Sequence, residues 1–100
     1  MQYTEQFLKQ VSSMGTLGYS LNKCINILDV ADNDIEAFTY DFDDTDSKVG
    51  KAYQKGVDKA AYAIDVKLFD LATKDGDLKA LEMFEARKAE ERERESARKN

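Results

Sequence analysis

The sequence contains no histidine, no proline and no tryptophan, and it has only one cysteine. Without histidine, a serine or cysteine nucleophile lacks its usual base and a zinc site lacks its commonest ligand. We therefore expect a protein that is not an enzyme, with no catalytic residues, no metal site and no cofactor. The absence of proline, the strongest interior helix breaker, favours long uninterrupted helices.

The lone cysteine and the absence of long apolar runs bear on location. Cys24 cannot form an intramolecular disulfide, and it lies between Leu21 and Ile25 on an apolar face. We interpret it as a small buried hydrophobe. Because neither a secretory signal nor a long apolar segment is present, we expect a cytoplasmic protein with no membrane partner.

Apolar residues recur at helical spacing in five segments, each with start or stop signals. The predicted helices are 3–14 (ended by Gly15), 21–28 (capped by Ser20), 34–42 (capped by Asp32 or Asn33), 48–74 (opened by Ser47) and a fifth that follows Asp77. Gly76 is expected to end the fourth helix, and so short a connection makes its neighbours antiparallel. The predicted fold is all-α: a helix-turn-helix-like bundle over 1–46, a long helical hairpin over 47–88, and a charged helical or frayed tail over 89–100.

The hairpin has two apolar features. Leu78, Leu81 and Phe84 are expected to fold back against Leu68 and Leu71. A second stripe is small and comprises Ala52, Gly56, Ala60 and Ala63. Gly56 costs up to about 1 kcal/mol of helix propensity, so we expect it to allow close approach of another helix, across a protein interface or within the hairpin.

Charge is unevenly distributed along the chain. Residues 29–46 hold eight acids and no base. Asp41, Asp43 and Thr45 alternate as in a calcium loop, but Asp46 and Ala52 stand where that loop needs glycine and glutamate, so we expect no calcium site. In contrast, Lys48, Lys51, Lys55 and Lys59 recur at threes and fours along one face of the fourth helix. This face is either simply solvated or a basic binding surface.

The order of the helices resembles that of phage terminase small subunits. Residues 17–42 read as a helix-turn-helix, "SLNKCINIL", "DVADN" and "DIEAFTYDF". The following segment is similar to the family's helical hairpin in its aromatic-x-x-Gly (Tyr53 to Gly56), its leucine stripe and "A-x-x-x-G-D-x-x-A-L" within residues 71–81. The similarity covers roughly residues 17–88.

The resemblance implies a non-enzymatic bacteriophage DNA-packaging component in the host cytoplasm. Such subunits form rings through their hairpins, recognise double-stranded viral DNA and regulate the large terminase subunit, which carries the ATPase and nuclease. The homo-oligomer interface would then comprise Tyr53, Gly56, Val57, Ala60, Ala61, Ile64, Leu68, Leu71, Leu78, Leu81 and Phe84. The candidate DNA-binding residues are Lys9, Lys23, Lys48, Lys51, Lys55 and Lys59.

One feature departs from the family: the helix at the recognition position is acidic. Phosphate attraction dominates nucleic-acid affinity and comes from lysine and arginine. Either DNA meets other surfaces, or this helix binds protein. The alternative function is therefore a helical adaptor whose acidic helix, residues 34–46, docks a basic partner. A third possibility is a DNA mimic whose acids imitate phosphates.

Overall fold

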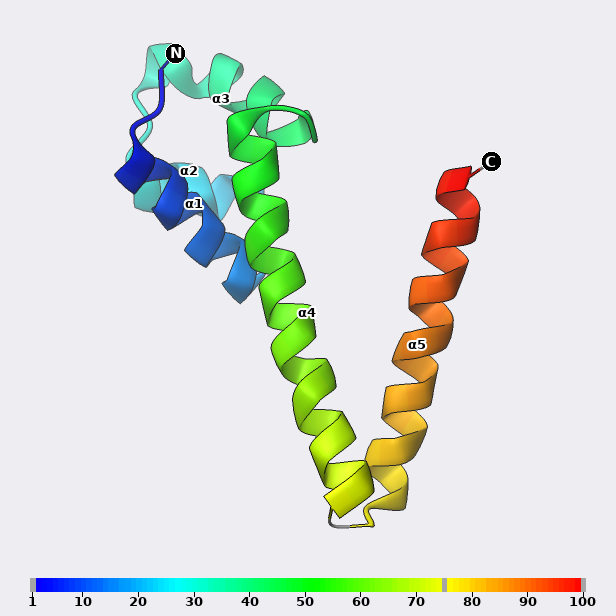
Figure 1. The fold of residues 1–100 in the computed structure, drawn as a ribbon. Coiled ribbons are helices and arrows are strands. Elements are labelled where there is room, and N and C mark those ends of the chain that lie inside the picture. Colours follow the sequence, from blue (N-terminus) through cyan, green and yellow to red (C-terminus); the bar gives the residue numbers. More distant parts are fainter. Residues whose placement is uncertain (1, 75, 100) are drawn as a thin grey trace. The chain divides into compact units, whose positions relative to one another are not determined.

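The computed structural model describes the backbone of residues 2–74 and 76–99, and the side chains among them as far as Arg94. Within these residues all regular structure is helical, as the sequence predicts. The elements are α1 (Glu5–Leu17), α2 (Leu21–Leu28), the short 3-10 helix η1 (Asp32–Asp34), α3 (Ile35–Asp43), α4 (Lys48–Lys74) and α5 (Leu78–Lys99) (Figure 1). The chain forms two compact units, residues 1–60 and 61–100, so α4 contributes to both. The predicted domain boundary after residue 46 falls inside the first unit.

The core of the first unit joins its four α-helical segments. Val11, Phe38 and Val49 are fully buried at its centre. Aromatic rings continue the core from the residues just before α1 through α1 and α3 to α4, in the order Tyr3, Phe7, Phe38, Phe42 and Tyr53, with neighbouring centroids 4.7–6.1 Å apart. The first segment of α4 is therefore part of this core as much as α1 or α3 is.

Four helix ends follow the local chemistry expected from the sequence. The hydroxyl oxygens of Ser20 and Ser47 accept hydrogen bonds from the amides of Lys23 (3.3 Å) and Gly50 (2.9 Å) at the starts of α2 and α4. Gly76 adopts a left-handed φ of 66°, and the Asp77 carboxylate accepts from the amide of Ala80 at 3.1 Å. These short-range signals end α4 and begin α5 as predicted.

Two predicted helix ends were wrong. Gly15 does not end α1; the helix continues to Leu17 and ends at Gly18, whose φ is 71°. Asp32 and Asn33 do not cap α3 from outside, because they lie within η1, and Asp34 precedes α3 without a side-chain capping bond. In both places the chain takes an extra helical turn that sequence spacing alone did not indicate.

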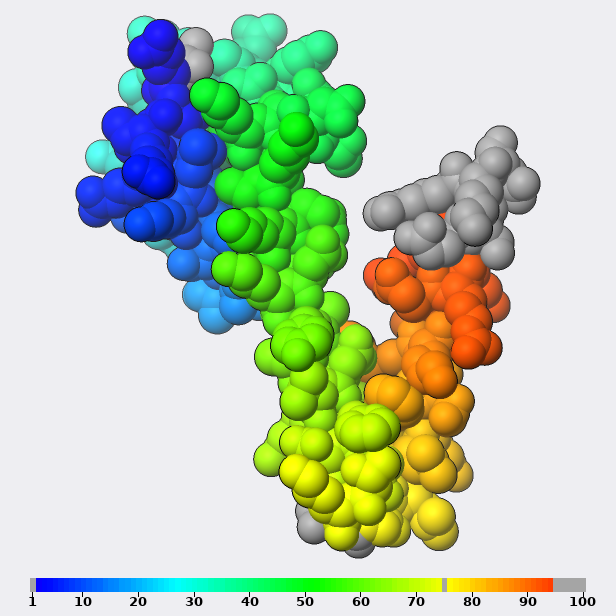
Figure 2. Space-filling model, in the orientation of Figure 1, coloured from blue at the N-terminus to red at the C-terminus, as the bar shows by residue number. Residues whose placement is uncertain are grey.

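Gly15 has a different role, which is to let α1 and α4 approach closely. A Cβ on Gly15 would lie 3.0 Å from the carbonyl carbon of Tyr53 and nearer still to its oxygen. A Cβ on Gly56 would lie 2.8 Å from both the Ser12 carbonyl carbon and the Thr16 amide nitrogen. The predicted close approach at Gly56 is thus confirmed, but its predicted place was wrong, because the neighbour is α1 of the same chain and not a protein interface or the other arm of the hairpin. The side chains of α1 (blue) lie directly against those of α4 (green) in Figure 2.

The second unit is an antiparallel hairpin made of residues 61–74 of α4 and α5 (Figure 1). Among its described residues Leu68 and Ala80 are buried, and the rings of Phe69 and Phe84 lie 5.5 Å apart. Arg87 pairs with the Asp65 carboxylate across the two arms. The prediction that Leu78 folds back against the other arm of the hairpin was wrong, since its side chain is 75% exposed.

Candidate functional site

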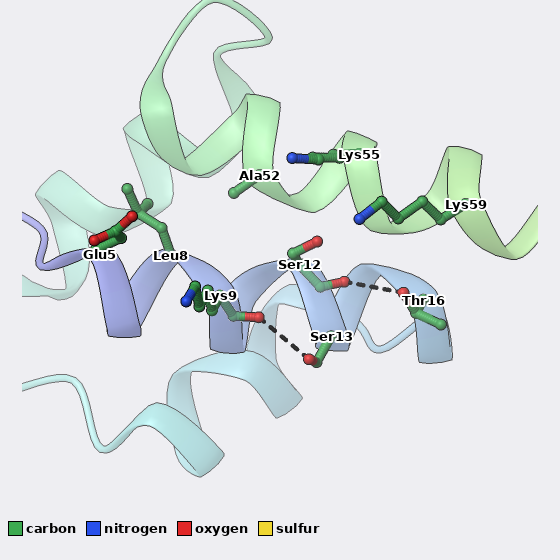
Figure 3. A pocket seen from close by; sticks show the side chains of 9 residues that line it. All are labelled: Glu5, Leu8, Lys9, Ser12, Ser13, Thr16, Ala52, Lys55 and Lys59. Carbon is green, nitrogen blue, oxygen red and sulfur yellow. Dashed lines mark hydrogen bonds between the residues drawn. The ribbon is translucent and has the colours of Figure 1, made fainter.

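A groove between α1 and α4 brings together lysines that are far apart in sequence. It has a volume of about 520 Å³ and lies entirely within the first unit. Lys9 lies on the α1 side, and Lys55 and Lys59 lie on the α4 side (Figure 3). We call this the basic groove; its other lining residues are Glu5, Leu8, Ser12, Ser13, Thr16 and Ala52. All three lysine side chains are exposed, so their charges are available to a ligand.

The close approach of the two helices sets the form of the basic groove. Gly56 lies on α4 between Lys55 and Lys59, where it contacts the backbone of α1. Thr16 strengthens this contact, since its hydroxyl donates to the carbonyl oxygens of both Gly56 and Ser12 at 3.2 Å. The lysines are therefore carried by two helices whose backbones are in contact, and not by a mobile loop.

The charge along the groove changes from one end to the other. Glu5 lies beside Leu8 at one end, whereas Lys55 and Lys59 lie further along, towards Ser12 and Thr16 (Figure 3). Ser13 donates to the carbonyl oxygen of Lys9 at 3.2 Å. The cationic end presents ammonium groups and the Ser12 hydroxyl, which are donors that suit phosphate oxygens.

The remaining candidate lysines divide into two sets. Lys48 and Lys51 are exposed on α4 and, by helical spacing, extend the lysine face of Lys55 towards the start of the helix. Lys23 lies on α2, where its ammonium nitrogen is 4.0 Å from the centroid of the Tyr19 ring, and it does not line the basic groove. The structure therefore brings together Lys9, Lys55 and Lys59 but not Lys23.

A second hollow lies on η1 and α3 and has the opposite charge. It is lined by Asn33, Glu36, Ala37, Tyr40 and Asp41. Tyr40 is 73% exposed, which is high for an aromatic side chain. We call this the acidic hollow. Asp41 is partly engaged within the chain, because its carboxylate accepts a 2.5 Å hydrogen bond from the Tyr3 hydroxyl.

The titratable groups with shifted pKa values belong to the core. Burial, and then the hydrogen bond to Asp41, raise the pKa of Tyr3 well above its ordinary value of 10.0. Burial also raises the pKa of the Cys24 thiol and of Tyr53, whose hydroxyl donates to the carbonyl oxygen of Tyr19 at 2.8 Å. These shifts keep each group neutral, which is the state expected of a structural residue and not of a nucleophile.

The candidate interface residues fall into three environments. Gly56 is buried against α1, and Tyr53 packs in the core of the first unit. Leu68 is buried inside the hairpin, while Val57, Ala60, Ala61, Leu71 and Phe84 are half-buried. Ile64, Leu78 and Leu81 are exposed. In the described part of the hairpin, the large apolar residues that are exposed and that the sequence did not single out are Tyr62, Val66, Phe69 and Met83.

Sequence reasoning named Lys9 but missed the other residues on the α1 side of the basic groove. Ser12 and Thr16 are a pair of small residues four apart, which is the same signal that drew attention to Gly56 on α4. Matching these small residues on two segments was the available clue that α1 and α4 cross there.

No helix in the described part of the chain is long and apolar enough to cross a membrane, and no group of three or more acidic or cysteine side chains there is placed to hold a metal ion.

Comparison of the chain with protein-family models, curated proteins and solved structures found no match in any of the three.

Proposed function

We propose that this protein is a non-enzymatic viral DNA-packaging component of the small terminase kind. It forms a homo-oligomer, binds double-stranded DNA and regulates a large terminase subunit. The observation that carries the proposal is the exposed apolar surface of the second unit. Seven large apolar side chains there are 41–75% exposed: Tyr62, Ile64, Val66, Phe69, Leu78, Leu81 and Met83.

Part of this surface forms a regular stripe. Tyr62, Val66 and Phe69 are spaced four and three apart on α4, so they share one face of the helix. Contiguous exposed apolar surface on a small protein marks a contact with another molecule. Since fully burying one such side chain contributes about 1.5–3 kcal/mol, a partner helix that covers the stripe gains substantial stability. A further copy of the same hairpin offers a matching apolar stripe.

Assembly would also raise the affinity with which the lysines bind DNA. Each exposed lysine alone attracts phosphate weakly at physiological salt. An oligomer presents the basic groove many times on one body, and linked weak contacts raise the affinity for a continuous DNA duplex far above that of one copy. Self-association and DNA binding therefore support each other in this proposal.

The test is to remove the stripe and measure both properties. Tyr62→Glu combined with Val66→Glu places two charges on the exposed stripe, and we expect monomers by analytical ultracentrifugation together with a large loss of duplex affinity at low salt. Lys67→Glu is the matched control, because it changes charge on an exposed α4 position outside the stripe. The proposal fails if the wild-type protein is monomeric and does not bind duplex DNA at low salt.

The acidic hollow favours a second function, a helical adaptor that docks a basic partner. An arginine side chain can pair with Glu36 while it stacks on the exposed Tyr40 ring. Binding of an arginine-rich peptide that is lost in Glu36→Gln with Tyr40→Ala would support this function. Asp41 is a poor position for the test, because its carboxylate also accepts a hydrogen bond from the Tyr3 hydroxyl and a substitution there would disturb the core.

A further inference from the structure

We infer that duplex DNA lies on the basic groove between α1 and α4, and that α3, the helix at the recognition position, stays out of the DNA grooves. This inference rests on the proposed function, since it concerns where the same ligand binds. In this inference the groove contacts the phosphodiester backbone of the DNA and contacts no base edge.

The first step in the argument is the distribution of charge over the first unit. The basic groove has three lysines and one acid, Glu5, along its length. The acidic hollow on η1 and α3 has Glu36 and Asp41 and no base among its lining residues. A duplex carries one negative charge per about 1.7 Å of its axis, so it is attracted to the first surface and repelled by the second.

The second step is the chemistry of the groups that line the basic groove. Ammonium groups, with three donors each, and the hydroxyl of Ser12 suit phosphate oxygens. No amide side chain and no arginine lines the groove, and these planar groups have the rigid geometry that best favours paired hydrogen bonds to base edges, whereas a lysine ammonium is a compact point charge. Contacts of this kind position a protein on DNA and carry no sequence information.

The third step is that the lysine pattern continues beyond the groove. Lys51 and Lys48 are exposed and precede Lys55 at the spacing of one helix face. The basic groove is thus one end of a longer cationic track along α4. A continuous strand of phosphates fits such a track better than a small isolated anion does.

The experiment measures binding of a fluorescently labelled duplex by anisotropy, over a range of salt concentrations and with two unrelated DNA sequences. The variants are Lys55→Gln with Lys59→Gln, and the same pair with Lys9→Gln added. We expect both duplexes to be bound more weakly by the same factor, and the slope of log affinity against log salt to fall by about one for each lysine that meets a phosphate. Lys55→Arg with Lys59→Arg keeps the charges and should keep the binding.

Two controls separate the groove from the rest of the unit. Lys23→Gln makes the same chemical change on α2, outside the groove, and should leave the affinity within about twofold of wild type. Tyr40→Ala removes the exposed aromatic side chain of α3 and should also leave it unchanged. Circular dichroism confirms that each variant is folded, which is expected because every substituted side chain is exposed.

The inference is overturned if Tyr40→Ala abolishes binding while the lysine variants bind as wild type does. In that case α3 is the contact, and the proposed function still stands. If the wild-type protein itself shows no affinity for either duplex at low salt, both the inference and the proposed function fail. A loss of affinity confined to one of the two DNA sequences would show base reading and would also overturn the inference.

Discussion

Replacing Gly56 with alanine tests whether the contact between α1 and α4 organises the first unit. In an ordinary helix this change is favourable, since alanine has about 1 kcal/mol better helix propensity than glycine. Here the added methyl group would lie 2.8 Å from two backbone atoms of α1, well inside the 3.4 Å at which ordinary contact begins, and nearer still to the Ser12 carbonyl oxygen. Backbone atoms cannot move away as the end of a side chain does, so the helices must separate.

The expected cost follows from that separation. Overpacking of this kind costs about 1–3 kcal/mol, and the Thr16 hydrogen bond to the Gly56 carbonyl oxygen contributes about 1 kcal/mol more if it is lost. Set against the gain in propensity, the net loss in the free energy of unfolding is about 1–3 kcal/mol. For a domain of this size each kcal/mol lowers Tm by about 4–8 °C.

Thermal unfolding followed by circular dichroism, at one fixed protein concentration, measures this loss. Gly15→Ala should shift Tm in the same direction, because its methyl group would meet the Tyr53 carbonyl. Gln10→Ala, at an exposed position of α1, is the control and should change stability by no more than about 0.5 kcal/mol. A Gly56→Ala protein as stable as wild type, or more stable, would refute the reasoning.

Two further predictions concern a helix cap and a tyrosine. Asp77→Ala removes the acceptor for the Ala80 amide and should destabilise the hairpin by about 1 kcal/mol, measured by urea unfolding; Asp77→Asn, which keeps a side-chain oxygen acceptor, should recover most of the loss. Because the pKa of Tyr3 is raised in the folded state, the stability that its protonated hydroxyl contributes is complete below its ordinary value of 10.0 and declines as the pH rises above it. Tyr3→Phe should make that decline shallower without abolishing it, since the pKa of Tyr53 is raised too; an unchanged pH profile of stability in Tyr3→Phe would contradict this prediction.

The helices could be predicted from the sequence because their signals are local. Ser20, Ser47 and the Gly76-Asp77 pair act on amides within three residues, and apolar spacing marks the faces that become buried. Cys24 was correctly predicted as buried for the same reason. These features need no knowledge of which helices meet.

The errors came from features that depend on tertiary contacts. A glycine near the end of an apolar pattern can either end a helix or allow a neighbouring helix to approach. Which of these two roles Gly15 has becomes clear only from the position of α4 beside it. Leu78 shares the spacing of a buried residue but is exposed in the hairpin. The local pattern records that a side chain is apolar and not what covers it.

The basic groove was partly predictable. The run from Lys48 to Lys59 is visible as one face of a helix, but the meeting of Lys9 with Lys55 and Lys59 depends on how α1 crosses α4. From the sequence, Lys23 and Lys9 were equal candidates for DNA binding. In the structure Lys9 lines the basic groove, whereas Lys23 lies over the Tyr19 ring outside it. Charge can be counted from a sequence, whereas the convergence of charges requires the fold.

The most direct test of the central claim is the native mass of the purified protein, measured by native mass spectrometry at two protein concentrations and two salt levels. We expect a closed assembly of many copies that persists as the protein is diluted, since the exposed apolar stripe of Tyr62, Val66 and Phe69 is then buried between copies. A monomer or a simple dimer under all four conditions would contradict the claim and would leave the acidic hollow as the surface to investigate.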